Sequence, residues 1–286
     1  MSNENIFKRS CLIQLSTSIW QGSRAIEPAL LEQNNEWLKA RKLLINPELL
    51  GPIRTCAHQA RKTVQQYSLP FPITSIYLVP KETLSMIDER LNAFKERFWN
   101  KVNDFVDQYE LAREDARSTL GDFFDETDYP ENIITKFNFE WRFLILGLPG
   151  KTGVLSPEIY EREKQKFVTL MEETRDLAMA ALRGEFGEII SHLLERLDGK
   201  PKTVKSSMLN RLKDFLDAFD TRNVFQDEVL HQLVQEAKAV VNGISPYGLQ
   251  YNEGMRNRIV EDMNRLRQAV DEAIEDIPRR KLRMAV

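Results

Sequence analysis

The segment LSMIDERLNAFKERFWNKVNDFVDQY, residues 84–109, decides the fold class because its apolar residues recur every three or four positions. The side chains between them are mostly charged, and this spacing is typical of an amphipathic helix. The helix is expected to span about 35 residues, or roughly 50 Å at 1.5 Å per residue. Such a length favours a projecting, coiled-coil-like arm. The apolar stripe consists of Leu84, Ile87, Leu91, Phe94, Phe98, Val102, Phe105 and Tyr109.

A second long helix is expected over residues 156–197. The tripeptide SPE at residues 156–158 supplies an N-cap, a proline at the first helical position and an acid near the positive end of the helix dipole. Gly184 and Gly187 interrupt the pattern and indicate a kink or a close helix crossing. The stripe of this helix is predicted at Phe167, Leu170, Leu177, Ala181, Ile189, Leu193 and Leu197.

The first half of the chain is expected to contain three short strands. LIQLSTSIW (12–20) alternates apolar and polar residues, and FNFEWRFLIL (137–146) places aromatic residues at alternate positions. PFPITSIYLVP (70–80) is bracketed by prolines, which favour the edge of a sheet.

Shorter helices are expected around these strands. One is predicted over residues 28–45, and another runs from a cap at Asn46, with Pro47 at the first helical position, to about Tyr67. Three more are predicted near residues 204–219, 224–241 and 252–277.

These elements predict a mainly α protein with a small β-sheet, of the α+β class. We expect a long antiparallel helical hairpin that projects from a small α/β base, plus a C-terminal helical bundle. The predicted parts are a base at 1–80 and 130–150, an arm at 81–120 and 156–198, C-terminal helices at 203–278 and a basic tail at 279–286.

The composition favours a soluble cytoplasmic protein. The chain of 286 residues is 42% hydrophobic and 29% charged, so a folded core is expected, and the net charge of -3 argues against wholesale attraction to nucleic acid. Two cysteines fit a reducing compartment better than a disulfide framework. No apolar run has the length of a membrane span, and we expect no signal peptide.

The stretch FLILGLPGKTG (143–153) resembles a nucleotide-binding P-loop, G-x-x-x-x-G-K-[ST]. With Gly150 as the second glycine, the first belongs at position 145, which is Ile145. Gly147 comes two residues late, so the loop is too short to wrap a phosphate, and the helix begins at Ser156 rather than directly after the loop. We interpret the stretch as a turn that joins a strand to a long helix.

Other catalytic patterns are weak. Glu228 and His231 have the i, i+3 spacing of di-iron carboxylate bundles but lack the further ligands that such a site needs. Cys56 and His58 point to different faces of one helix, and no G-x-S-x-G elbow is present. We therefore expect no enzymatic activity, no cofactor and no metal site.

Two surfaces are candidates for binding. A long arm buries little of its own surface, so leftover aromatic residues need a partner or self-association. These candidate interface residues are Phe98, Trp99, Phe123 and Phe124. The basic tail is the candidate contact for nucleic acid through Arg279, Arg280, Lys281 and Arg283.

Several stretches together resemble a known family. STSIWQGSRAI, KLLINPELLGPIRTCAHQARKTV, the short strand that ends in YLVP before a long helix, and FNFEWRFLI are similar to the uncharacterised bacterial and phage proteins catalogued as domain of unknown function 3150. This resemblance carries no catalytic residues. It implies a context on mobile elements, often beside a MoxR-type AAA+ ATPase and a von Willebrand A-type protein.

The leading hypothesis is a non-enzymatic helical adaptor or scaffold whose partner is such an ATPase or von Willebrand A-type protein. The alternative is a nucleic-acid-associated factor in recombination or phage defence.

Overall fold

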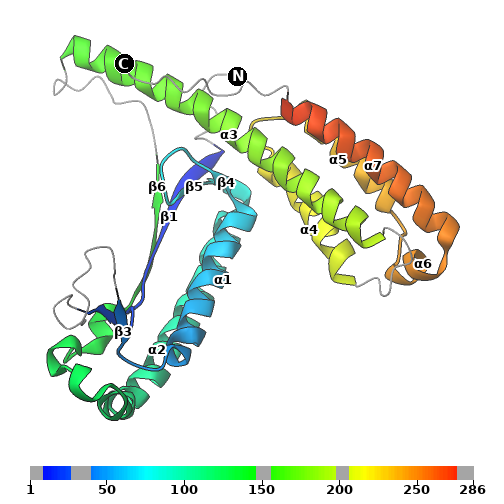
Figure 1. Ribbon diagram of the computed structural model, residues 1–286. Coiled ribbons are helices and arrows are strands. Elements are labelled where there is room, and N and C mark those ends of the chain that lie inside the picture. Colours follow the sequence, from blue (N-terminus) through cyan, green and yellow to red (C-terminus); the bar gives the residue numbers. More distant parts are fainter. Residues whose placement is uncertain (1–8, 27–39, 146–155, 198–205, 276–286) are drawn as a thin grey trace. The chain divides into compact units, whose positions relative to one another are not determined.

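The computed structural model describes residues 9–26, 40–145, 156–197 and 206–275 and confirms an α+β fold with long helices (Figure 1). Its strands are β1 (Ser10–Ser18), β2 (Ser23–Ala25), β3 (Arg41–Leu43), β4 (Leu69–Pro70), β5 (Ile76–Pro80) and β6 (Asn138–Leu144). A four-stranded sheet has the order β4-β5-β1-β6, and β2 pairs with β3 in a second sheet. The three strands expected from the sequence all belong to the larger sheet.

The helices agree closely with the periodic signals. They are α1 (Gly51–Tyr67), α2 (Leu84–Leu120), α3 (Pro157–Leu197), α4 (Ser206–Arg222), α5 (Glu228–Val241), α6 (Pro246–Tyr251) and α7 (Glu253–Glu275). Short 3-10 helices are η3 (Pro47–Leu50), η4 (Lys81–Thr83), η5 (Gly121–Phe123), η6 (Glu126–Asp128) and η7 (Ile133–Lys136). None of the helices in the described ranges is long and apolar enough to cross a membrane.

The prediction of a single edge strand at residues 70–80 needs correction. It contributes to two strands that pair antiparallel, with Leu69 opposite Leu78 and Pro70 opposite Tyr77. The edge of the sheet is therefore β4, whereas β5 lies between β4 and β1. The proline rule was right about the edge but assigned it to the wrong part of the segment, because the chain turns back between the two strands.

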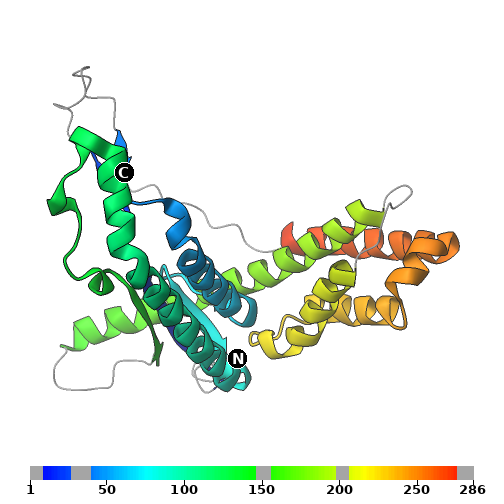
Figure 2. The same cartoon turned by 90° about the horizontal axis from the view of Figure 1, so that it is seen from below.

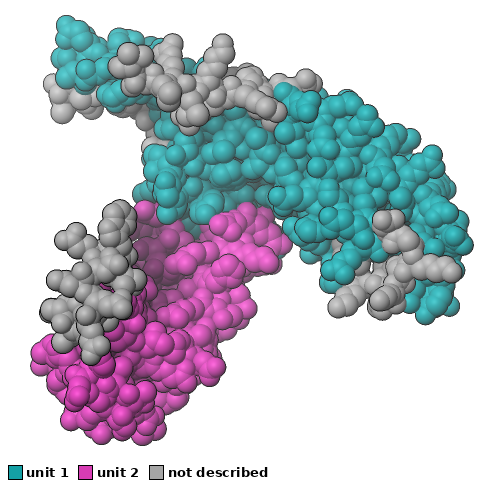
Figure 3. All heavy atoms as spheres, viewed as in Figure 1, with its two compact units in different colours: residues 1–13, 67–84, 143–286 teal, residues 14–66, 85–142 magenta. Residues whose placement is uncertain are grey.

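The chain divides into two compact units (Figure 3). Unit 1 consists of residues 1–13, 67–84 and 143–286, and unit 2 consists of residues 14–66 and 85–142. Each unit therefore draws on separate stretches of the sequence, and each is described by itself below.

Unit 2 is built around α2, whose predicted stripe is confirmed. From Ile87 to Tyr109, every predicted stripe position is buried; Leu84, in unit 1, is half-buried. The Cys56 thiol of α1 donates to the Phe94 carbonyl oxygen of α2 at 3.6 Å, and the ring of Phe105 lies 5.8 Å from that of Phe137. The long helix thus lies against α1 on one side and the β6 segment on another.

The predicted cap at Asn46 is confirmed at the start of η3, which leads into α1. Asn46 is the N-cap of η3, and its side-chain oxygen accepts from the Glu48 backbone N–H at 3.0 Å. The helix expected over residues 28–45 is wrong where the structure describes it, because β3 occupies its end and Arg41 pairs with Ala25. A cross-strand partner distant in sequence overrides the local helical pattern there. The rest of that prediction, residues 28–39, lies outside the described residues.

Unit 1 has its core among α3, α4, α5 and α7, and α3 and α7 lie side by side in both ribbon views (Figures 1 and 2). Gly187 marks the close helix crossing that its position suggested: a Cβ there would lie 3.1 Å from Arg267 Nη1 and 3.3 Å from Val270 Cγ1. Around Gly184 nothing lies within 4 Å of such a Cβ, and α3 continues through both glycines.

The stripe predicted for α3 needs correction in its middle. Leu177 is 39% exposed, whereas Ala178, Leu182 and Phe186 are buried. Large apolar residues occur on more than one face of this helix, so periodicity alone does not reveal which face the neighbouring helices cover.

The antiparallel hairpin of the two long helices stays a prediction, because α3 belongs to unit 1 and α2 largely to unit 2. In the described contacts α3 packs on α7, α4 and β4, and α2 belongs largely to unit 2. Apolar stripes show that a helix needs a partner but do not identify the partner.

Candidate functional site

An apolar groove of about 510 Å³ opens on unit 2 along the last turns of α2. The facing wall comes from the end of β3, from η3 and from the residues between them. The groove is lined by Leu43, Ile45, Asn46, Pro47, Leu49, Ala112, Asp115, Ala116, Thr119 and Leu120.

The groove exists because the stripe of α2 changes from large to small side chains. After Tyr109, the next buried positions on this helix are Ala112 and Ala116, one turn apart. The alanine side chains are too small to fill the space that aromatic side chains fill earlier along α2. Leu43 is 55% exposed at the opposite wall. Apolar surface is therefore left open to solvent.

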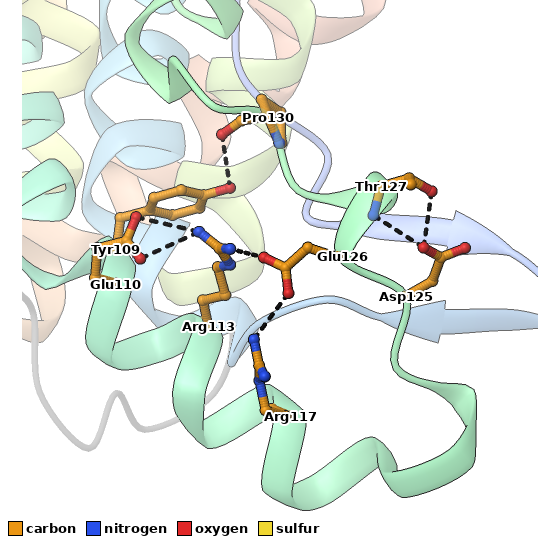
Figure 4. Close-up of polar contacts among 8 residues, drawn as sticks. All are labelled: Tyr109, Glu110, Arg113, Arg117, Asp125, Glu126, Thr127 and Pro130. Carbon is orange, nitrogen blue, oxygen red and sulfur yellow. Dashed lines mark hydrogen bonds and ion pairs between the residues drawn. The ribbon is translucent and has the colours of Figure 1, made fainter.

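A network of polar contacts holds the chain that follows α2 against that helix (Figure 4). Glu126 accepts from Arg117 at 2.8 Å and forms an ion pair with Arg113. The Tyr109 hydroxyl donates to the Pro130 carbonyl oxygen at 3.2 Å. These contacts fix the end of α2, which forms one side of the groove.

The other wall is fixed by a second set of charges. The Asp128 carboxylate, almost fully buried, accepts from Lys42 Nζ at 2.7 Å and from Arg24 Nε at 3.3 Å. Lys42 also donates to the Phe123 carbonyl oxygen at 2.6 Å. The β2–β3 pair is thereby tied to the chain after α2, and Leu43 follows Lys42 directly into the groove.

Two groups in this region have shifted pKa values. Burial raises the pKa of Tyr109 to about 12. The pKa of Asp125 is lowered because its carboxylate accepts from the Thr127 backbone N–H at 2.9 Å and from the Thr127 hydroxyl at 2.8 Å. Both groups hold the chain in place: Asp125 caps η6, and Tyr109 anchors Pro130.

The four predicted interface residues lie in different environments. Phe98 is fully buried with its ring 5.3 Å from that of Phe139, so it belongs to the core of unit 2. Trp99 is half-buried beside Phe98. Phe124 stacks on Tyr129 at 5.1 Å. Phe123 alone of the four is largely exposed, at 45%.

Most of the remaining predicted site residues lie outside the described residues. The basic residues of the tail at 279–283 and the stretch GLPGKTG at 147–153 lie outside the described residues. His231 lies with Nδ1 3.5 Å from Asp220 Oδ1. Among the described residues no group of three or more His, Cys, Asp or Glu side chains is arranged to hold a metal ion.

The sequence reasoning missed the groove itself. Its signal was present in the α2 stripe, where alanines at i and i+4 follow a run of aromatic residues while the helix continues. The facing wall was not visible, because residues 43–49 were expected to be helical and precede Ala112, the first lining residue of α2, by more than 60 positions in the chain.

Comparison with known proteins identifies one similarity. The model of a protein family described as "Protein of unknown function (DUF3150)" matches residues 7–188, which is more than half of the chain. Both walls of the groove fall inside the matched region. No curated protein and no solved structure matches.

Proposed function

This chain belongs to the family described as "Protein of unknown function (DUF3150)", and from this starting point we propose that it is a non-enzymatic helical adaptor that binds a protein partner in the groove beside α2. The observation that carries the proposal is the apolar lining of the groove. Leu43, Ile45 and Leu49 face Ala112 and Ala116 across it, and Leu43 is open to solvent. Apolar concave surface of this kind marks binding sites in proteins.

The polar contacts around the groove support a binding role. The ion pairs of Glu126 and Asp128 hold both walls in place before any partner arrives. A preformed site loses less conformational entropy on binding than a site that must first be ordered. Phe123 and Leu111, which follow or belong to α2, are also largely exposed apolar side chains.

The candidate partners come from the family resemblance, which implies a MoxR-type AAA+ ATPase and a von Willebrand A-type protein. The test is co-expression of the tagged chain with each candidate, followed by affinity purification. Thr119→Arg places a bulky cation in the groove, because Thr119 lines the groove and is exposed. Ser118→Arg is the matched control, since Ser118 is an exposed neighbour outside the lining.

The adaptor proposal expects a candidate to co-purify with the unchanged chain and with Ser118→Arg, and to be lost with Thr119→Arg. Circular dichroism of both variants checks that α2 remains folded. Equal recovery of the partner with both variants would show that the groove is not the binding site.

A further inference from the structure

We propose that the groove binds an amphipathic α-helix whose apolar face is flanked by basic side chains. This inference rests on the proposed function, since it takes the groove as the docking site, and it adds the conformation and the charge of the occupant.

The backbone around the groove indicates a helix rather than an extended strand. The floor is the side of α2, whose backbone N–H groups in this stretch donate within the helix and are not available to a bound strand. An extended peptide laid on it would bury its own N–H groups without hydrogen-bond acceptors that it could share along the helix, which is unfavourable. A helical occupant satisfies these groups internally, and helix-in-groove binding is a recurrent mode of recognition.

The small residues on the floor fit the same occupant. Ala112 and Ala116 lie on one face of α2, and Leu120 continues that face for another turn. The stretch from Ala112 to Leu120 measures roughly 12 Å at 1.5 Å per residue, which matches about two turns of a partner helix. Alanines allow two helix axes to approach at the short end of the usual 8–10 Å range. A partner helix can therefore place apolar side chains against both alanines.

The charges at the rim determine the flanks of that helix. Asp115 lines the groove, Glu48 lies between the lining residues Pro47 and Leu49, and Asp122 follows the end of α2; all three are exposed. In the described part of the chain no ion pair joins any of these three carboxylates to a cation.

Most cations near the groove are engaged in ion pairs, and Arg41 of β3 instead donates to the Ser23 hydroxyl at 3.1 Å. Arg113 and Arg117 are bound to Glu126, and Lys42 is bound to Asp128. The unbalanced charge at the rim is therefore negative, and lysine or arginine beside the apolar face of the occupant complements it.

The test uses three synthetic peptides of about 15 residues, a length at which a helix needs a covalent staple to be stable in water. The first is a stapled helix with a leucine face flanked by lysines. The second replaces the lysines with glutamates, and the third has the first sequence with a central proline and no staple. Fluorescence anisotropy measures the affinity of each for the full chain at moderate and high salt.

The lysine helix is expected to bind at least roughly tenfold more tightly than the glutamate helix and the proline peptide, with a preference that declines as salt rises. Thr119→Arg abolishes this binding, and Ser118→Arg retains it. Asp115→Lys removes the preference for lysine over glutamate, whereas Glu89→Lys, an exposed position near the other end of α2, leaves it unchanged.

Several results overturn the inference. Equal binding of the lysine and glutamate helices refutes the charge assignment, and tighter binding of the proline peptide refutes the helical conformation. If both preferences fail but Thr119→Arg still abolishes binding, the docking groove stands and only the nature of its occupant is wrong. A photocrosslink from position 119 to this chain's own residues 277–286, in preference to the lysine helix, identifies the basic tail as the occupant instead.

Discussion

The buried ion pair between Arg183 and Asp227 offers the sharpest test of how unit 1 is held together. Arg183 Nε and Nη2 donate to the two Asp227 oxygens at 2.7 and 2.9 Å, and Arg183 also donates to the Ala273 carbonyl oxygen. Both charged side chains are almost fully buried. The same Asp227 carboxylate is the N-cap of α5 and accepts from the Leu230 backbone N–H at 3.1 Å. One aspartate therefore connects α3 to the start of α5.

The loss of stability on replacing Asp227 has two separate contributions. Removing one partner of a buried pair leaves an uncompensated charge and costs about 3–5 kcal/mol. Losing an N-cap side chain costs about 1 kcal/mol more. Asp227→Ala should lower the free energy of unfolding by about 4–6 kcal/mol. Asp227→Asn should lower it by about 1 kcal/mol less, because asparagine caps as well as aspartate. A loss of this size lowers Tm by roughly 10–20 °C in a domain of this size.

Hydrogen exchange of the α3, α5 and α7 amides, combined with guanidinium unfolding followed by circular dichroism, localises the loss to unit 1. The variant Arg183→Met combined with Asp227→Asn completes a double-mutant cycle. We expect a coupling energy of at least about 2 kcal/mol, because the second change removes the charge that the first leaves unpaired. If Asp227→Ala lowers the unfolding free energy by less than about 1 kcal/mol, this account of the ion pair is wrong.

Three further predictions concern individual side chains. Gly187→Leu should overpack the α3–α7 contact and lower the free energy of unfolding by about 1–3 kcal/mol. Gly184→Ala, with open space around it, should raise the free energy of unfolding by about 0.5–1 kcal/mol. Urea unfolding measures both changes. The pKa of Tyr109 is raised to about 12 in the folded protein, so its contribution to stability is complete below about pH 10 and should be lost as pH rises towards 12. In pH-scanned unfolding, Tyr109→Phe should remove this contribution and leave that of Tyr129, whose pKa burial also raises. Burial raises the pKa of the Cys11 and Cys56 thiols, so a thiol reagent at mildly alkaline pH should label both slowly in the folded protein and rapidly after unfolding.

The sequence by itself determined the elements whose signals are local. The α2 stripe, the cap at Asn46 and the helix start at Ser156 each depend on residues within one or two turns, and each appears in the structure. A glycine within a long helical pattern is likewise a local signal, and Gly187 does lie at a close helix crossing. The sequence did not identify α7 as the crossing helix.

The tertiary structure alone decided which surfaces meet. Residues 41–43 form a strand because a partner strand is available, α3 packs on α7 and α4, and Phe98 lies in the core while Phe123 is largely exposed. The groove likewise requires Leu43 and Ala116 to face each other across a gap. The apolar stripe of a helix is stabilised equally by any apolar surface that excludes water from it. The stripe therefore shows which side chains must be buried. Only the complete fold determines which surface buries them.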